Sequence, residues 1–146
     1  MFKIINIKNM NLFYEENVEN EINDILQINE FSKKYNLYLN EKDAKKIIEH
    51  KNLILKEYGL IECANITDKI IYEFYDSKYI FQGNYVSSIN KIIEIFFLVQ
   101  QRYYHAFTDE EIVKYLRKLF DEDFHGELMV FLDNVLDKFE ELYEKY

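Results

Sequence analysis

The feature that most limits the fold of this chain is its near absence of helix-breaking residues: 146 residues include no proline and only three glycines. Proline and glycine disfavour helices more than other residues do, so a chain that lacks them can stay helical over long stretches. Apolar residues make up 49% of the chain, and they recur at intervals of three and four, the period of one helix face. The sequence therefore predicts an all-α fold, a compact bundle forming a single domain over residues 1–146.

Apolar spacing and capping residues divide the chain into five or six helices. The predicted helices cover residues 17–35, 40–59, 65–76, 84–104, 108–120 and 126–143. Asn40, Asn84 and Thr108 are the predicted N-caps, and Thr108 begins a capping box. Residues 85–104 are apolar almost all the way round in their centre, which predicts a buried helix in the middle of the bundle.

The N-terminal region carries two expectations. The apolar residues of the first predicted helix fall on one stripe that we expect to face the core: Val18, Ile22, Ile25, Ile28, Phe31 and Tyr35. Residues 1–16 alternate only loosely between apolar and polar. They are predicted to form an N-terminal arm, with a short strand and a disordered segment left open.

The net charge of −9 is unevenly distributed. Residues 109–146 hold 12 acidic and five basic side chains, whereas residues 1–108 hold 15 acidic and 13 basic ones. An acidic segment repels phosphate, which argues against nucleic acids and anionic membranes as partners. The most apolar window, residues 92–99, is far shorter than the roughly 20 residues needed to span a bilayer. We expect a cytoplasmic protein in which Cys63 is reduced.

Motifs for metals, cofactors and nucleophiles are weak. Asp121, Asp123 and Gly126 match three positions of a calcium loop, but Leu132 stands where that loop needs a bidentate glutamate. The neighbour of Cys63 is acidic, which disfavours the reactive thiolate form. The glycines are too isolated to build a phosphate-binding loop. We predict no cofactor, no metal site and no catalytic residue, and we favour a protein without enzymatic activity.

The densest aromatic stretch, residues 74–85, joins the third and fourth predicted helices. Aromatic residues in such a connection either line a ligand site or contact surface, or plug one end of the bundle. The binding residues predicted from this stretch and from the end of the long helix are Asp76, Ser77, Tyr79, Tyr85 and Tyr103.

Several short motifs between residues 29 and 139 carry a resemblance. They are Asn29-Glu30, Glu41-x-Asp43-Ala44, Asp76-Ser77-x-Tyr79-Ile80 followed by Tyr85, Thr108-Asp109-Glu110-Glu111 and Gly126-Glu127. With these motifs the chain resembles an uncharacterised bacterial family of small helical cytosolic proteins, a domain of unknown function. The chain departs from the family pattern at Asn36, Leu60 and Lys78, where the family has Gly, Arg and Pro. The resemblance implies a shared helical fold and no particular activity.

These observations lead to one functional prediction and one alternative. We predict a small acidic interaction or regulatory protein without catalysis, whose partner is a protein, either a basic one or a second copy in a homodimer. The contact surface would be the 74–85 connection or the acidic residues 109–146, since acidic surfaces speed encounters with basic partners. The alternative is a small-molecule-binding protein or an enzyme with a pocket near residues 76–85.

Overall fold

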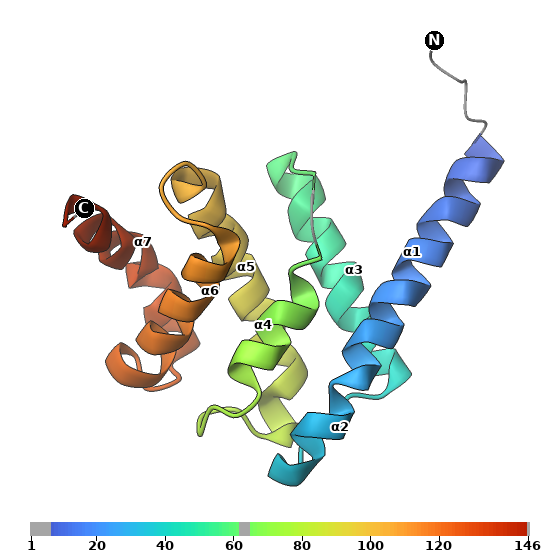
Figure 1. Ribbon diagram of the computed structural model, residues 1–146, viewed down its shortest axis with the longest axis horizontal. Coiled ribbons are helices and arrows are strands. Elements are labelled where there is room, and N and C mark those ends of the chain that lie inside the picture. The colour runs from blue at the N-terminus through green and yellow to red at the C-terminus, as the bar shows by residue number, and fades with distance from the viewer. Residues whose placement is uncertain (1–6, 62–64, 146) are drawn as a thin grey trace.

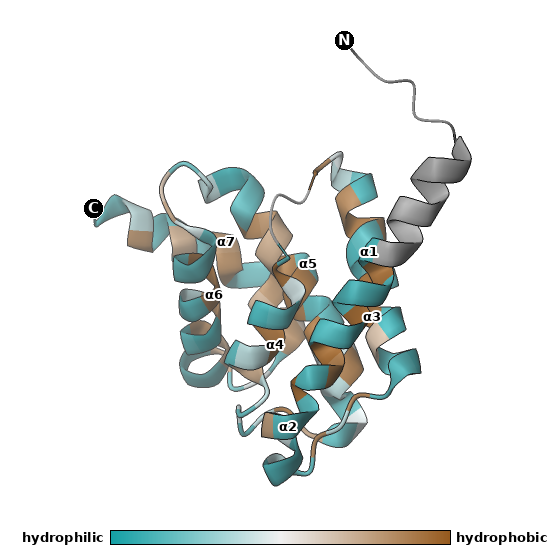
Figure 2. Ribbon diagram, turned by 45° about the vertical axis from the view of Figure 1, so that its right-hand side comes forward, coloured by the Kyte–Doolittle hydropathy of each residue, from teal (hydrophilic) through white to brown (hydrophobic). Residues whose placement is uncertain are grey.

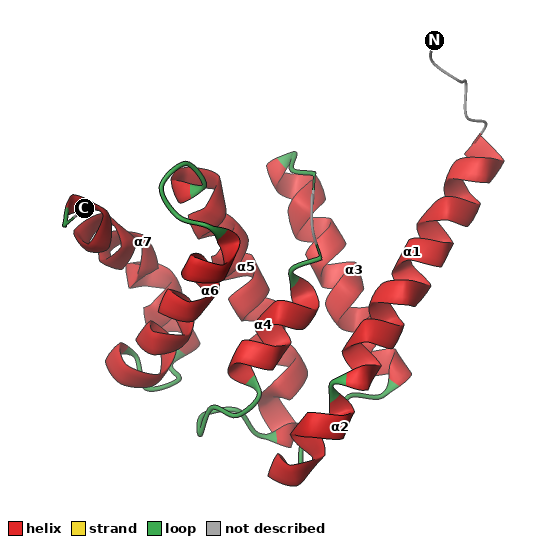
Figure 3. Ribbon diagram, in the orientation of Figure 1, coloured by secondary structure: helices red, strands yellow, loops and turns green. Residues whose placement is uncertain are grey.

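All secondary structure in the computed structural model, which describes residues 7–61 and 65–145, is helical (Figure 3). Side chains are described from residue 17 onward. The elements in chain order are α1 (Ile7–Gln27), α2 (Asn29–Ser32), the 3₁₀ turn η1 (Lys33–Tyr35), α3 (Glu41–Tyr58), α4 (Thr67–Phe74), the 3₁₀ turn η2 (Gln82–Asn84), α5 (Tyr85–Tyr103), α6 (Asp109–Lys118), the π-helical turn η3 (Leu119–Asp123) and α7 (Leu128–Glu144).

The long apolar helix α5 lies at the centre of the bundle. Helices α3, α4, α6 and α7 pack around it, and α1 lies across α3 and α4 (Figure 1). Ten of the 19 residues of α5 are buried, and hydrophobic residues follow its length in Figure 2, whereas the outer faces of α6 are hydrophilic. The predicted all-α bundle around a buried helix at residues 85–104 is confirmed.

Local capping signals set the starts of α3 and α6. The Asn40 side chain accepts a hydrogen bond from the backbone N–H of Asp43, and the reciprocal bond completes a capping box at the start of α3. The capping box of Thr108 and Glu111 is also confirmed at the start of α6. Asn84 precedes α5 but makes no side-chain cap, because its side chain binds the backbone of the preceding turn.

The N-terminal region differs from both expectations. Residues 7–16 belong to α1, although we expected them to form an arm or a strand. The helix extends this far because no proline or glycine interrupts it. Residues 1–6 lie outside the described part. The helix also breaks at Ile28 instead of continuing to residue 35. The break turns Phe31 and Tyr35 away from the core, leaving them 51% and 46% exposed.

The break is held by the segment that follows it. Both atoms of the Asn29 side-chain amide bind the backbone of Leu39: Nδ2 donates to the carbonyl (2.8 Å), and Oδ1 accepts from the N–H (2.9 Å). The Ser32 hydroxyl donates to the carbonyl of Leu37 at 3.0 Å. These bonds satisfy the backbone of an extended segment that has no helix or sheet partner of its own. They fix residues 37–39 against α2.

Candidate functional site

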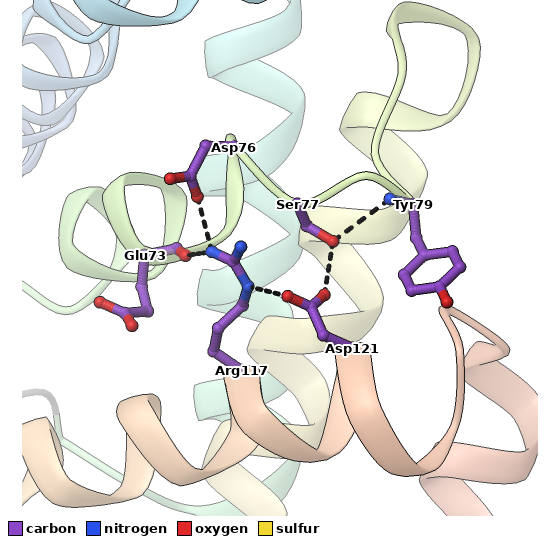
Figure 4. A network of polar contacts seen from close by, with 6 residues as sticks. All are labelled: Glu73, Asp76, Ser77, Tyr79, Arg117 and Asp121. Carbon is purple, nitrogen blue, oxygen red and sulfur yellow. Dashed lines mark hydrogen bonds and ion pairs between the residues drawn. The ribbon is translucent and has the colours of Figure 1, made fainter.

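Arg117 of α6 organises the predicted aromatic connection between α4 and α5 (Figure 4). Its Nη1 atom donates hydrogen bonds to the backbone carbonyl of Glu73 and to Oδ1 of Asp76, the latter at 2.6 Å. Its Nε atom donates to Oδ2 of Asp121 at 2.7 Å, and the other oxygen of Asp121 accepts from the Ser77 hydroxyl at 2.6 Å. We call these five residues the Arg117 clamp. The clamp fastens the end of α4 and the following turn to α6.

The clamp requires an arginine. Burial alone lowers the pKa of Arg117, but the hydrogen bonds and charges of Asp121 and Asp76 outweigh burial and raise the pKa above its ordinary value. A planar guanidinium can serve two carboxylates and a carbonyl at once, whereas a lysine ammonium acts as a point charge. This geometry gives a structural role to one of only two arginines in a chain with 16 lysines.

The side chain of Tyr79 packs against the π-helical turn η3 and against the bend that follows it. The helix predicted for residues 108–120 continues through η3 to Asp123, and α7 begins at Leu128, two residues later than predicted. Gly126 has a φ of +77°, and a Cβ atom at this glycine would lie 2.5 Å from the Cβ of Tyr79. The Tyr79 ring also meets Phe120 edge-on, with ring centroids 6.0 Å apart. The bend at Gly126 therefore creates the space that Tyr79 fills.

Tyr85 and Tyr103 are not part of this arrangement. Tyr85 is buried in the core, and its hydroxyl makes no hydrogen bond within the described residues. Burial raises the pKa of Tyr85, and the neighbouring Ser32 hydroxyl offsets part of this rise. Tyr103 lies at the other end of α5 and donates a 2.6 Å hydrogen bond to Glu140 of α7. Burial, together with that hydrogen bond and the charge of Glu140, raises the pKa of Tyr103 to about 12. The five predicted binding residues therefore do not form one site.

The clamp is a fastening between elements, because its polar atoms satisfy one another. Ser77 is buried, and both oxygens of Asp121 accept hydrogen bonds from clamp residues. The described part of the chain has four surface grooves with volumes of about 210 to 520 Å³; Glu73 lines one of them, and none of the four is lined by Asp76, Ser77 or Tyr79. The binding role of Asp76, Ser77 and Tyr79 therefore stays a prediction, and their observed contacts are structural.

The residues singled out as metal ligands or nucleophile are otherwise engaged or lie outside the described part. Asp121 belongs to the clamp, and Asp123 forms an ion pair with Lys138 at 3.4 Å. Cys63 is one of the residues that the structure does not describe. Among the described side chains, those of residues 17–61 and 65–145, no group of three or more His, Cys, Asp or Glu is placed to hold a metal ion.

Aromatic side chains gather beside the clamp, on α2, η1, the end of α4 and the α4–α5 connection. Three edge-to-face contacts link four of them in a row: Phe31 to Tyr72 (5.6 Å between ring centroids), Tyr72 to Tyr75 (6.4 Å) and Tyr75 to Tyr35 (5.7 Å). Tyr38 and Phe81 are exposed on the two segments that border this row. We call these six residues the aromatic surface: Phe31, Tyr35, Tyr38, Tyr72, Tyr75 and Phe81.

The two segments that carry the aromatic surface are joined by a side-chain amide. Oε1 of Gln82 accepts from the N–H of Tyr38 at 2.8 Å, and Nε2 of Gln82 donates to the carbonyl of Tyr38, also at 2.8 Å. On the other side of the same turn, Asn84 binds the backbone of Tyr79 and Phe81. In Figure 1 the joined segments lie at the lower end of the bundle, beside α2. The aromatic surface is thus held by hydrogen bonds on both of its segments.

Sequence reasoning missed Arg117 and four of the six residues of the aromatic surface, because the predicted stretch 74–85 contains only two of the six, Tyr75 and Phe81. The available signal for Arg117 was the rarity of arginine in a lysine-rich chain, which marks a position where the fork geometry matters. For Phe31 and Tyr35, the signal was Asn29, an amide in the middle of the predicted helix, where such side chains compete for backbone hydrogen bonds. Both signals point to contacts across the fold that spacing alone does not specify.

Residues 24–145 match a described protein family, "Family of unknown function (DUF6323)". The chain belongs to this family. The DUF6323 match covers every residue of the Arg117 clamp and of the aromatic surface. The chain matches no curated protein and no solved structure. Within the part of the chain that the structure describes, no helix is both long enough and apolar enough to cross a membrane.

Proposed function

We propose that this DUF6323 protein is a non-catalytic module that binds another protein through the aromatic surface. The observation that carries the proposal is a set of six aromatic residues from two distant segments that hydrogen bonds join; five of the six are exposed, and ring contacts link four of them in a row. Tyrosine and phenylalanine are enriched in protein interfaces, and buried tyrosines are among the residues that contribute most to binding. Six such residues on two joined segments are a suitable contact surface.

The fixed position of these side chains supports the proposal. A flexible loop loses conformational entropy when it binds, and this loss weakens affinity. Here Arg117 holds the end of α4, next to Tyr72 and Tyr75, while Gln82 holds Tyr38 against the turn that carries Phe81. A surface that is ordered before binding keeps more of its contact energy, so the clamp contributes to binding by fixing geometry.

Site-specific photo-crosslinking in cells that express the protein tests the proposal. A benzophenone-bearing amino acid replaces Phe81 (61% exposed) on the aromatic surface, Tyr104 (72%) beside the acidic C-terminal helix, or Leu53 (61%) on α3. We expect one protein adduct that forms from position 81 and not from position 53. Phe31→Ser should abolish that adduct without changing the circular dichroism spectrum.

The three positions separate the competing interpretations. An adduct from position 104 but not from position 81 would place the contact on the acidic C-terminal third, and the proposed surface would be wrong. Equal adducts at all three positions would indicate non-specific encounters and would also contradict the proposal. The absence of any adduct would refute a protein-binding role for this face.

A further inference from the structure

We infer that the aromatic surface binds an extended, proline-rich segment of its partner in the polyproline II conformation. This inference rests on the proposed function and specifies the kind of partner. Polyproline II segments dock against rows of aromatic rings, where prolyl rings pack on the aromatic faces. Neighbouring rings in the row from Phe31 to Tyr35 are 5.6 to 6.4 Å apart, a distance that two residues of such a segment cover at about 3.1 Å per residue.

The hydrogen-bonding capacity of the surface fits this ligand. The hydroxyls of the exposed residues Tyr35, Tyr38 and Tyr72 make no hydrogen bond within the described residues, although each phenol can donate one hydrogen bond. A polyproline II segment has no internal hydrogen bonds, so its backbone carbonyls need external donors. A helical partner has already paired its carbonyls and would bury these phenols without acceptors.

The described part of the chain lacks the groups that other modes of peptide recognition require. Strand addition needs a free sheet edge, and every described element of this chain is helical. Recognition of phosphorylated segments needs an arginine cluster, but Arg117 is engaged in the clamp and Arg102 lies near Tyr103 at the other end of α5. A strongly charged partner is also disfavoured, because acids and bases alternate around the rings, as in the Lys33–Glu30 ion pair at 3.3 Å.

The surface continues into an apolar groove on one side. Tyr72 lies at the edge of a groove of about 300 Å³ between α4 and α6, whose apolar lining includes Ile66 and Val113. Lys69 and Glu110, of opposite charge, also line this groove. An extended segment lying across α4 could pass from the aromatic row into this groove, so the binding face is longer than the row itself.

Titration of the isotope-labelled protein with decaproline, followed by amide chemical shifts, tests the inference. We expect saturable shifts confined to residues 29–39 and 66–84, with a dissociation constant in the range of about 0.1 to 1 mM for so short a ligand. A glycine-serine peptide of the same length, which is extended but has no rings, should give no saturable shifts. Raising the salt concentration should change the affinity by less than about twofold, because no phosphate-like charge is involved.

Matched variants separate the phenols from the rings. Tyr72→Phe keeps the ring and should weaken binding severalfold, whereas Tyr72→Ser removes it and should weaken binding by about tenfold or more. Tyr104→Phe, an exposed tyrosine outside the aromatic surface, should have no effect. Equal affinity for decaproline in Tyr72→Ser and the unchanged protein would overturn the inference.

The two proposals fail in distinguishable ways. If decaproline does not bind while a protein adduct still forms from position 81, the partner is not proline-rich and the proposed function stands. If a proline-rich peptide binds but its shifts map to α7, the inference about this surface is wrong. If neither decaproline nor an adduct is found, both proposals fall.

Discussion

Replacing Arg117 with lysine tests the clamp most directly. The substitution keeps the charge but leaves an ammonium that cannot serve Glu73, Asp76 and Asp121 together. A hydrogen bond to a charged group contributes about 1.5–3 kcal/mol when partly buried. Asp76 is 44% exposed, so its pairing is worth less than about 1 kcal/mol because solvent screens it.

The bond to Asp121 dominates the expected loss, since its side chain is 27% exposed and also holds Ser77. Lysine can keep one of the three contacts, so we expect Arg117→Lys to lower the free energy of unfolding by about 2 kcal/mol. For a chain of this size that corresponds to a fall in melting temperature of about 4–8 °C. Urea unfolding followed by far-ultraviolet circular dichroism measures the change at pH 7.

The other arginine of the chain is the matched control. Arg102 is exposed on α5, with its guanidinium 6.0 Å from the centroid of the Tyr103 ring. Arg102→Lys should change the free energy of unfolding by no more than about 0.5 kcal/mol. Equal losses for the two substitutions would refute the reasoning, because the clamp would then contribute nothing beyond a generic arginine. In a cycle with Asp121→Asn, we expect a coupling energy of about 1 kcal/mol or more.

Two further outcomes follow from the contacts of Tyr79 and Tyr103. Gly126→Ala should lower the free energy of unfolding by at least about 2 kcal/mol, because Gly126 has a positive φ and the new methyl group would collide with Tyr79. Gly83→Ala is the control, since its Cβ would meet its nearest atom at 3.4 Å. Equal urea midpoints for the two variants would contradict the explanation. The pKa of Tyr103 is raised to about 12 from an ordinary value of about 10, so the folded state binds the phenol proton more tightly than the unfolded state does. The stability that this proton contributes is therefore present below about pH 10 and is lost as the pH rises from about 10 to 12. Tyr103→Phe, which loses the bond to Glu140, should show a smaller fall in urea midpoint over that interval, and an unchanged fall would show that other groups cause it.

What the sequence predicts well in this protein depends on interactions between near neighbours. The capping boxes at Asn40 and Thr108 join residues three apart, and the burial of α5 follows from the composition of one segment. The clamp joins residues 41 and 44 apart in the chain. No periodicity contains that information, because many arrangements of the helices would place Arg117 near some carboxylate.

The error at Phe31 and Tyr35 has the same origin. Their spacing fits an extended helical stripe, and the local signal against that stripe is a single amide, Asn29, directly after Ile28. The break depends on Asn29, whose amide binds the backbone of Leu39 ten residues later. These two hydrogen bonds pair backbone groups of a segment that has no helix or sheet partner and whose groups would otherwise stay unpaired. The rings are then displayed on the surface instead of lining the core.

Amide and guanidinium side chains thus bind the backbone of the segments that carry the aromatic surface, where helix hydrogen bonds are missing. Asn29 and Gln82 bind the two consecutive backbone units at Leu39 and Tyr38, and Arg117 binds the last turn of α4. Without these contacts, the exposed aromatic rings would lower the free energy of the protein by folding back onto the bundle and burying apolar area. Because polar contacts hold the backbone on both segments, the rings stay exposed in a defined arrangement. Weakening the clamp should therefore reduce the exposure and the ordered spacing of the rings before it unfolds the bundle.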